Sequence, residues 1–234
     1  IPKIIHQIWH GPDKKPNIWM DSWKIDYIKQ NPNWEYLFWD EKIINEKIKL
    51  KNNKIFNDEQ FFTGKSDIVR YEILKKYGGI FIDSDSLWIN KKNNSLNKII
   101  GLSEKSGMFC AEEPINKWSY ANGVIGFEKN HEILDNMIDF INKNYYKLKK
   151  KFPKHRQVWQ VTGPQPFTEI VKNSNRKLVL PSYYFYPESF HKNNLNLDKN
   201  KFHTMYPNSI MFQYGYTTNN ILKNNVMKKY IKNS

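Results

Sequence analysis

Residues 66–85 read SDIVRYEILKKYGGIFIDSD, and this stretch decides the fold. Its first half predicts a helix over 67–77 that has Ser66 as its N-cap and ends at the Gly-Gly pair. Its second half predicts a buried strand over 80–83 that runs directly into an Asp-Ser-Asp triplet. A helix followed at once by a buried strand is typical of an α/β sheet protein.

The rest of the chain continues this alternation of strands and helices. The apolar segments 1–9 and 34–39 predict two strands, and the aromatic spacing over 18–30 predicts a helix between them. Further elements are expected at 40–62 (irregular helix), 108–111 and 123–127 (strands), 131–150 (helix), and 179–180 and 210–212 (short strands). Without a Pro/Ser-rich linker, residues 1–234 are expected to form one α/β domain with a mostly parallel sheet.

Composition excludes several classes of protein. The 234 residues are 39% hydrophobic and 15% aromatic, which is enough apolar surface to rule out an intrinsically disordered chain. The sequence has no apolar run of membrane-spanning length. The single cysteine, Cys110, rules out an internal disulfide framework and a multi-cysteine zinc site, and it is expected to be a small buried side chain.

The charge is strongly positive, with 37 Lys and Arg against 23 Asp and Glu and a net charge of +14. Two interpretations remain open: codon bias in an AT-rich genome, or an anionic partner such as a nucleotide, an acidic glycan, a membrane surface or nucleic acid. The basic run 147–154 is interpreted as a solvated helix end rather than a binding patch. Because lysines are spread evenly and aromatics follow core spacing, a nucleic-acid-binding protein is disfavoured.

Asp83 and Asp85 form the first candidate site. Their carboxylates at i and i+2 on an extended segment point the same way, with Cα atoms about 6.5–7 Å apart. This arrangement suits Mg²⁺ or Mn²⁺ held partly by one carboxylate, partly by water and partly by a ligand's phosphates. The alternative is a pair of turn-forming aspartates. A glycoside hydrolase is disfavoured because neighbours on one strand end do not straddle a substrate.

Asp67, Arg70 and Trp9 are the other candidates. Asp67 and Arg70 share a helix face, and Arg70 is one of three arginines in a lysine-rich chain. Its planar fork can bind phosphate or sugar oxygens, whereas the alternative is a surface ion pair. Trp9 follows the first strand, where it can be either a stacking platform for a base or a core residue.

Three segments together resemble a known family: IPKIIHQIWHG (1–11), NPNWEYLFWD (31–40) and the opening stretch 66–85. They resemble glycosyltransferases with the Asp-x-Asp sugar-binding region, whose members include yeast initiating mannosyltransferases, bacterial capsular sugar transferases and, distantly, large clostridial glucosylating toxins. Weaker matches follow at 121–134, 162–168 and 183–190. The resemblance implies a GT-A fold, Rossmann-like, with a nucleotide-sugar half at about 1–100 and an acceptor half at about 101–234.

The resemblance also implies an activity. A retaining enzyme would transfer a hexose or N-acetylhexosamine from a nucleotide sugar, with UDP-sugars favoured, to a hydroxyl of a glycan or protein. Mn²⁺ or Mg²⁺ would be its cofactor, and the leaving phosphate would help deprotonate the acceptor in a front-face attack. The cytoplasm of the producing or host cell is the expected compartment, since no signal peptide or membrane span is visible. Nucleic acid is not an expected partner.

Carried over residue by residue, the resemblance implies a donor pocket and an acceptor wall. Trp9 would stack on the base beside Ile8. Asp67 and Arg70 would hold the ribose and the donor sugar. Asp83 would contact the sugar and a metal-bound water, and Asp85 would bind the metal directly. The implied catalytic residues are Asp83, Asp85 and Arg70, and the implied acceptor wall is Asn122, Gly163 and Pro164.

The C-terminal segment departs from the family pattern. Relatives often end in a His-x-x-x-x-Ser-Trp-like motif, and here Gln213 takes the place of the histidine and Thr218 that of the serine, with no Trp. Thr218 or Asn219 is expected to complete the metal site. The departure leaves open a degenerate member that binds a nucleotide sugar without transferring it.

Overall fold

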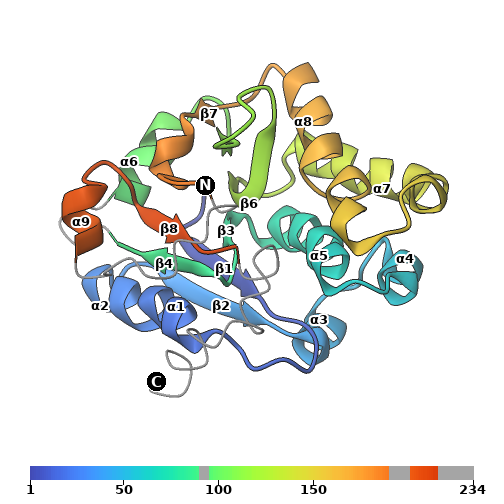
Figure 1. The fold of residues 1–234 in the computed structure, drawn as a ribbon, viewed down its shortest axis with the longest axis horizontal. Coiled ribbons are helices and arrows are strands. Elements are labelled where there is room, and N and C mark those ends of the chain that lie inside the picture. Colours follow the sequence, from blue (N-terminus) through green and yellow to red (C-terminus); the bar gives the residue numbers. More distant parts are fainter. Residues whose placement is uncertain (90–94, 190–200, 216–234) are drawn as a thin grey trace.

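A computed structural model describes residues 1–89, 95–189 and 201–215 of the chain (Figure 1). Its central sheet has six strands in the order β2-β1-β3-β6-β5-β7. The strands are β1 (Ile4–Ile8), β2 (Glu35–Trp39), β3 (Gly79–Ile82), β5 (Met108–Glu112), β6 (Tyr120–Phe127) and β7 (Val179–Leu180). A separate antiparallel pair consists of β4 (Ser86–Trp88) and β8 (Met211–Gln213).

The sheet is mostly parallel, as predicted. Strand β1 pairs in parallel with β2 and β3, and β5 pairs in parallel with β7. Strand β6 pairs antiparallel with both β3 and β5, so it alone reverses direction in this sheet. The connection from β5 to β6 spans residues 113–119, which is too short for the helical crossover that a parallel pair requires.

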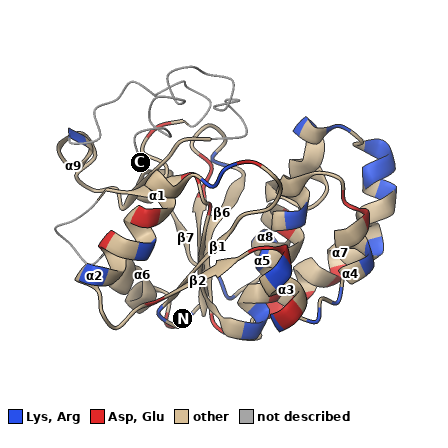
Figure 2. Ribbon diagram, turned by 90° about the horizontal axis from the view of Figure 1, so that it is seen from below, with Lys and Arg blue, Asp and Glu red and all other residues tan. Residues whose placement is uncertain are grey.

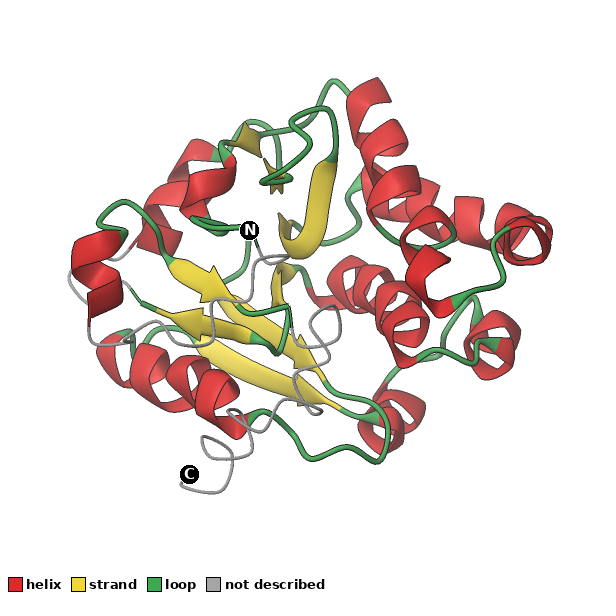
Figure 3. Ribbon diagram, viewed as in Figure 1, coloured by secondary structure: helices red, strands yellow, loops and turns green. Residues whose placement is uncertain are grey.

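Helices cover both faces of the sheet, as Figure 3 shows. The helical segments are α1 (Asn17–Asp21), η1 (Ser22–Tyr27), α2 (Ile28–Gln30), α3 (Glu41–Lys47), α4 (Asn53–Asp58), α5 (Phe62–Tyr77), α6 (Ser95–Leu102), α7 (Glu132–Lys151), η2 (His155–Gln160), α8 (Pro164–Asn173), η3 (Ser182–Tyr184) and α9 (Phe202–Met205). Helices α5 and α7 pack in the core on one face, and η1 and α6 pack in the core on the other. This is the layered arrangement expected of an α/β protein.

Helix α5 begins earlier than the sequence predicts. It starts at Phe62 with Phe61 as its N-cap, so the predicted cap at Ser66 is wrong. Gly64 lies inside the helix, where it packs tightly: a Cβ there would come within 2.8 Å of the Glu59 carboxyl carbon. The helix then ends at Gly78, whose φ of 62° is a conformation that favours glycine.

The segment that follows the Asp-Ser-Asp triplet forms β4, which the sequence did not predict. The Trp23 indole Nε1 donates a hydrogen bond to the Ser86 carbonyl at 3.0 Å, and the Trp88 amide donates to Ser22 Oγ at 3.0 Å. In each bond one partner, Trp23 or Ser22, belongs to the π-helical turn η1, which lies in the middle of the predicted helix 18–30. Segment η1 therefore fixes the chain immediately after the acidic triplet.

The chain offers no helix suited to crossing a membrane within the residues that the structure describes. Cys110 is fully buried in the core of the sheet, as expected.

Candidate functional site

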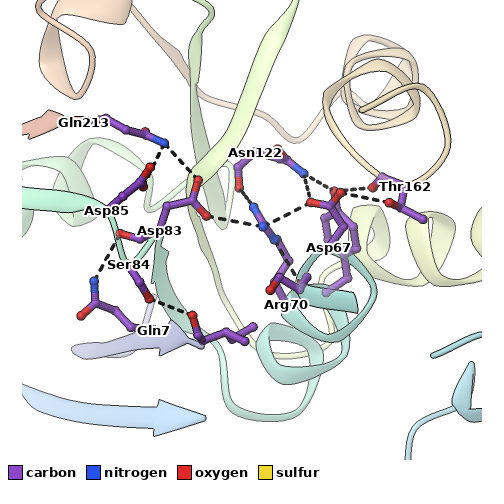
Figure 4. Close-up of polar contacts among 12 residues, drawn as sticks. Gln7, Asp67, Arg70, Asp83, Ser84, Asp85, Asn122, Thr162 and Gln213 are labelled. Atoms are coloured by element: carbon purple, nitrogen blue, oxygen red, sulfur yellow. Dashed lines mark hydrogen bonds and ion pairs between the residues drawn. The ribbon is translucent and has the colours of Figure 1, made fainter. Parts of the chain in front are cut away.

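The acidic triplet directly follows β3, and hydrogen bonds connect it to β1 and β6 (Figure 4). The Asp83 amide donates to the Gly123 carbonyl of β6 at 2.9 Å. Ser84 Oγ donates to the Ile8 carbonyl at 2.8 Å, and Gln7 Nε2 donates to the Asp83 carbonyl at 3.3 Å. These bonds place the triplet at the carboxyl edge of β1 and β3, where ligands bind in sheets of this kind.

The carboxylates of Asp83 and Asp85 converge on the side chain of Gln213, at the end of β8. Gln213 Nε2 donates to Asp83 Oδ2 at 3.2 Å and to Asp85 Oδ1 at 3.4 Å. The Tyr214 amide donates to the Asp85 carbonyl at 3.1 Å, which fixes β8 beside the triplet. One side-chain amide NH2 group thus faces two carboxylates, in a position that a cation could also take.

Asp67 and Arg70 form a buried cluster beside the triplet. Asp67 Oδ1 accepts from Asn122 Nδ2 at 2.9 Å, and Asp67 Oδ2 accepts from Thr162 Oγ1 at 3.0 Å. The Arg70 guanidinium lies 3.2 Å from Asp67 Oδ1 and donates to the Asn122 carbonyl at 2.6 Å. Burial raises the pKa of Asp67, and the Arg70 charge and the two hydrogen bonds oppose that rise.

Arg70 also connects the buried cluster to the triplet. Its Nη2 atom lies 3.4 Å from Asp83 Oδ1, and its guanidinium stacks 4.2 Å from the centre of the Phe81 ring. Burial raises the pKa of Asp83, although its side chain keeps 27% of its surface exposed, and the positive charge of Arg70 and the hydrogen bond from Gln213 oppose that rise. Arg70 therefore favours the ionised form of Asp83, which is the form that binds a cation.

Gly123 is a site residue that the sequence analysis did not single out. A Cβ atom at this position would lie 2.5 Å from Asp83 Oδ2, closer than a carbon and an oxygen can approach. The backbone of β6 therefore comes close to the Asp83 carboxylate because residue 123 has no side chain. The sequence predicts a strand over 123–127 and a family resemblance over 121–134, but no local signal in it indicates the contact with Asp83.

Glu113 is a second missed residue. It directly follows β5, whose end lies at the same edge of the sheet as the end of β3. Burial, with a smaller contribution from the charge of Asp83, raises the pKa of Glu113 to about 7. The rule that ligands gather at the carboxyl ends of parallel strands could have identified this residue.

The remaining donor residues lie at the end of β1. Ile8 is buried, and its carbonyl is occupied by Ser84. Trp9 is half-buried, and its Nε1 atom donates to the Asp13 carbonyl at 2.8 Å. The stacking role of Trp9 stays a prediction, as does the donor-binding role of Ile8.

The predicted acceptor wall lies at the Asp67 end of the site. Asn122 is buried within the Asp67–Arg70 cluster. Gly163 is the N-cap of α8, and a Cβ there would lie 3.2 Å from Asp67 Oδ2. Pro164 follows it, half-buried, as the first residue of α8. Thr218 and Asn219, the predicted additional metal ligands, lie outside the described residues.

The residues present fit a hard divalent cation. Among the described residues no group of three His, Cys, Asp or Glu side chains is arranged around one point. The donor set is instead two carboxylates and an amide: Gln213 Oε1 is buried and has no hydrogen-bond partner within the described ranges. Oxygen donors in this number suit Mg²⁺ or Mn²⁺ that keeps water or phosphate in its other positions.

Comparison with known proteins agrees with this geometry. The family described as "Glycosyltransferase sugar-binding region containing DXD motif" matches residues 16–103. The uncharacterized glycosyltransferase L373 of Acanthamoeba polyphaga mimivirus is 33% identical over 80% of this chain and 73% of its own length. Inositol phosphoceramide mannosyltransferase 3 of Schizosaccharomyces pombe is 29% identical over 76% of this chain, which spans only 46% of that protein.

Solved structures show the same fold at low sequence identity. The glycosyltransferase domain of the YGT toxin has a TM-score of 0.52 at 11% identity, covering 76% of this chain and 80% of that one. PaToxG glycosyltransferase has a TM-score of 0.51 at 21% identity, covering 73% and 69%. The fold is that of the GT-A class of glycosyltransferases. The chain belongs to the glycosyltransferase family with the Asp-x-Asp sugar-binding region, as its sequence motifs predicted.

Proposed function

We propose that this glycosyltransferase moves a hexose or N-acetylhexosamine from a nucleotide sugar to an acceptor hydroxyl, with retention of configuration and with Mn²⁺ or Mg²⁺. The observation that carries the proposal is the convergence of Asp83 and Asp85 on one point, occupied by the Gln213 amide, beside the buried Arg70. UDP-sugars are the favoured donors, and the acceptor is a glycan or a protein.

Asp83 and Asp85 would hold the cation, and Gln213 can add an amide oxygen. The ion would supply positive charge to the diphosphate, which offsets the negative charge that develops as the glycosidic bond breaks. Within the protein, Arg70 holds Asp83 ionised and oriented. It lies 5% exposed, and its contacts to Asp67, Asp83 and Asn122 favour a positioning role over direct contact with phosphate.

Retention is supported by the resemblance rather than by a nucleophile in the site. In the expected front-face reaction the acceptor hydroxyl attacks from the side of the departing diphosphate, and a phosphate oxygen takes its proton. The closed Asp67–Arg70 cluster fits this course, because its carboxylate already accepts two hydrogen bonds and an ion pair. Asp67 is therefore held as a structural anion instead of an attacking group.

A thermal-shift screen tests the donor class. The ligands are UDP-glucose, UDP-galactose, UDP-N-acetylglucosamine and GDP-mannose, each with and without Mn²⁺; GDP-mannose is included because the fission-yeast relative is named a mannosyltransferase. A donor at 100 times its Kd stabilises the fold by about 2.7 kcal/mol. For a chain of this size the melting temperature should rise by roughly 5–11 °C.

The outcomes separate the enzyme from a degenerate binder. The proposal expects a Mn²⁺-dependent shift with one donor, followed by release of the nucleoside diphosphate when an acceptor or water is available. A shift without any release would identify the binding-only alternative. No shift with any donor, with or without Mn²⁺, would contradict the nucleotide-sugar proposal.

A further inference from the structure

The end of α7 and the segment after it form a basic surface. Residues 141–168 contain seven Lys and Arg and no Asp or Glu: Lys143, Lys147, Lys149, Lys150, Lys151, Lys154 and Arg156. Lys149 is paired with the buried Glu59 at 2.7 Å, whereas Lys150, Lys154 and Arg156 are exposed. Figure 2 shows Lys and Arg in blue along α7 and the turn that follows it.

Three large apolar side chains are exposed in η2 and in the connection between β5 and β6. Trp118 is 81% exposed and Ile115 is 64% exposed, both in the connection between β5 and β6. Trp159, in η2, is 49% exposed. Trp118 contributes little to the core, because about four-fifths of its surface is exposed to water. Exposed apolar side chains that cluster on a surface commonly mark an interaction site.

A hydrogen bond and a close backbone approach connect these segments to α8. The Tyr120 amide, two residues after Trp118, donates to Thr168 Oγ1 of α8 at 2.8 Å. A Cβ on Gly163, the N-cap of α8, would lie 2.8 Å from the Cα atom of Trp159 and 3.2 Å from Asp67 Oδ2. The β5–β6 connection and η2 therefore flank the N-terminal part of α8, at the Asp67 end of the candidate site.

We propose that this apolar-basic rim, comprising Ile115, Trp118, Lys150, Lys154, Arg156 and Trp159, docks on an anionic lipid bilayer. Tryptophan prefers the boundary between water and lipid, and an exposed isoleucine gains from leaving water. Exposed Lys and Arg near a negatively charged leaflet each add to the attraction. Either signal alone gives weak binding, and the rim carries both.

The chemistry of the rim favours a bilayer over nucleic acid. Nucleic acid would use cations interleaved with aromatic rings on which bases stack, and Ile115 offers no such surface. On the rim the apolar side chains come from the β5–β6 connection and η2, and the cations come from the end of α7, the segment after it and the start of η2. Docking would turn the Asp67 end of the site towards the bilayer. The inference goes beyond the proposed function, because binding to lipid requires no nucleotide sugar.

Co-sedimentation with lipid vesicles tests the rim without any sugar donor. The probes are phosphatidylcholine vesicles with and without about 30% phosphatidylserine at physiological salt. Wild type should sediment with the anionic vesicles and less with the neutral ones. The triple variant Lys150→Glu, Lys154→Glu, Arg156→Glu and the double variant Ile115→Ser, Trp118→Ser should each bind at least about ten-fold less.

A matched control separates the rim from net charge. The triple variant Lys24→Glu, Lys29→Glu, Lys105→Glu removes the same charge from exposed residues of η1, α2 and the turn that follows α6. It should bind anionic vesicles nearly as well as wild type. An equal loss of vesicle binding in the control would overturn the proposal. So would wild type that does not bind anionic vesicles, or that binds RNA or heparin instead. Circular dichroism and melting temperature confirm that each variant is folded.

Discussion

The two ends of the candidate site differ in how completely their charges are compensated. At the buried end, Asp67 accepts hydrogen bonds from Asn122 and Thr162 at 2.9 and 3.0 Å and an ion pair from Arg70. At the open end, Asp83 and Asp85 share one amide donor at 3.2 and 3.4 Å, and Asp83 also lies 3.4 Å from Arg70 Nη2. The first end is already satisfied by the protein, so it builds the scaffold. At the second end two carboxylates face one amide group, so we expect this end to bind a divalent cation.

Removing Arg70 should give the largest loss of stability. In the Arg70→Met variant the buried Asp67 loses the cation that compensates its charge, which typically costs about 3–5 kcal/mol. Denaturation by urea measures the free energy of unfolding. The double variant Asp67→Asn, Arg70→Met should recover part of the loss, because an amide removes the uncompensated charge. Equal stability of Arg70→Met and wild type would show that the buried end is not the scaffold.

Replacing Glu113 should change the pH dependence of stability. Its folded-state pKa of about 7 lies above the ordinary value of 4.5, so between these pH values the unfolded chain binds fewer protons than the folded one. The free energy of unfolding of wild type should therefore fall as pH rises from about 4.5 to about 7. Glu113→Gln should remove that fall and be more stable than wild type above pH 7, by an amount on the order of 2–3 kcal/mol.

Urea denaturation measures the free energy of unfolding of both proteins across this pH range. Glu112→Gln is the control, because Glu112 is the neighbouring residue and is also half-buried. Parallel pH profiles for wild type and Glu113→Gln would show that the Glu113 carboxyl is not held in its neutral form by the fold.

A methyl group at Gly123 should disturb the open end while leaving the buried end in place. The added Cβ in Gly123→Ala would lie 2.5 Å from Asp83 Oδ2, so the carboxylate must move. We expect a loss of about 1–2 kcal/mol in stability and a much larger loss in turnover, because the metal-binding geometry changes. Gly101→Ala is the matched control, since its Cβ meets no atom within 4 Å. Normal turnover of Gly123→Ala would contradict the close approach of β6 to the site.

The sequence could predict the open end of the site because its signals are local. An apolar strand followed at once by Asp83 and Asp85 places both carboxylates at a ligand-binding edge. The contact with Gln213 depends on the pairing of β4 with β8 across more than 120 residues. Strand β4 has three residues, too few to show a period of two, so nothing nearby in the sequence indicates it.

The buried end shows a different limit of sequence reasoning. The spacing of Asp67 and Arg70 indicates an ion pair on one helix face, and the structure contains that pair. Its burial follows from Thr162 and Asn122, which come from distant segments. Ser66 is a residue type that favours N-caps, but α5 begins at Phe62, and Gly64 within it packs tightly against Glu59.

The central claim is that Asp83 and Asp85 hold a divalent cation that binds the nucleoside diphosphate. Calorimetric titration of wild type and Asp85→Asn with UDP or GDP in the presence of Mn²⁺ tests this claim most directly. The stability of Asp85→Asn should change by less than about 0.5 kcal/mol, the smallest effect among these variants. Wild type should bind one of the nucleotides in a Mn²⁺-dependent manner, and Asp85→Asn should bind it at least about ten-fold more weakly. Equal Mn²⁺-dependent affinity in the two proteins would contradict the account.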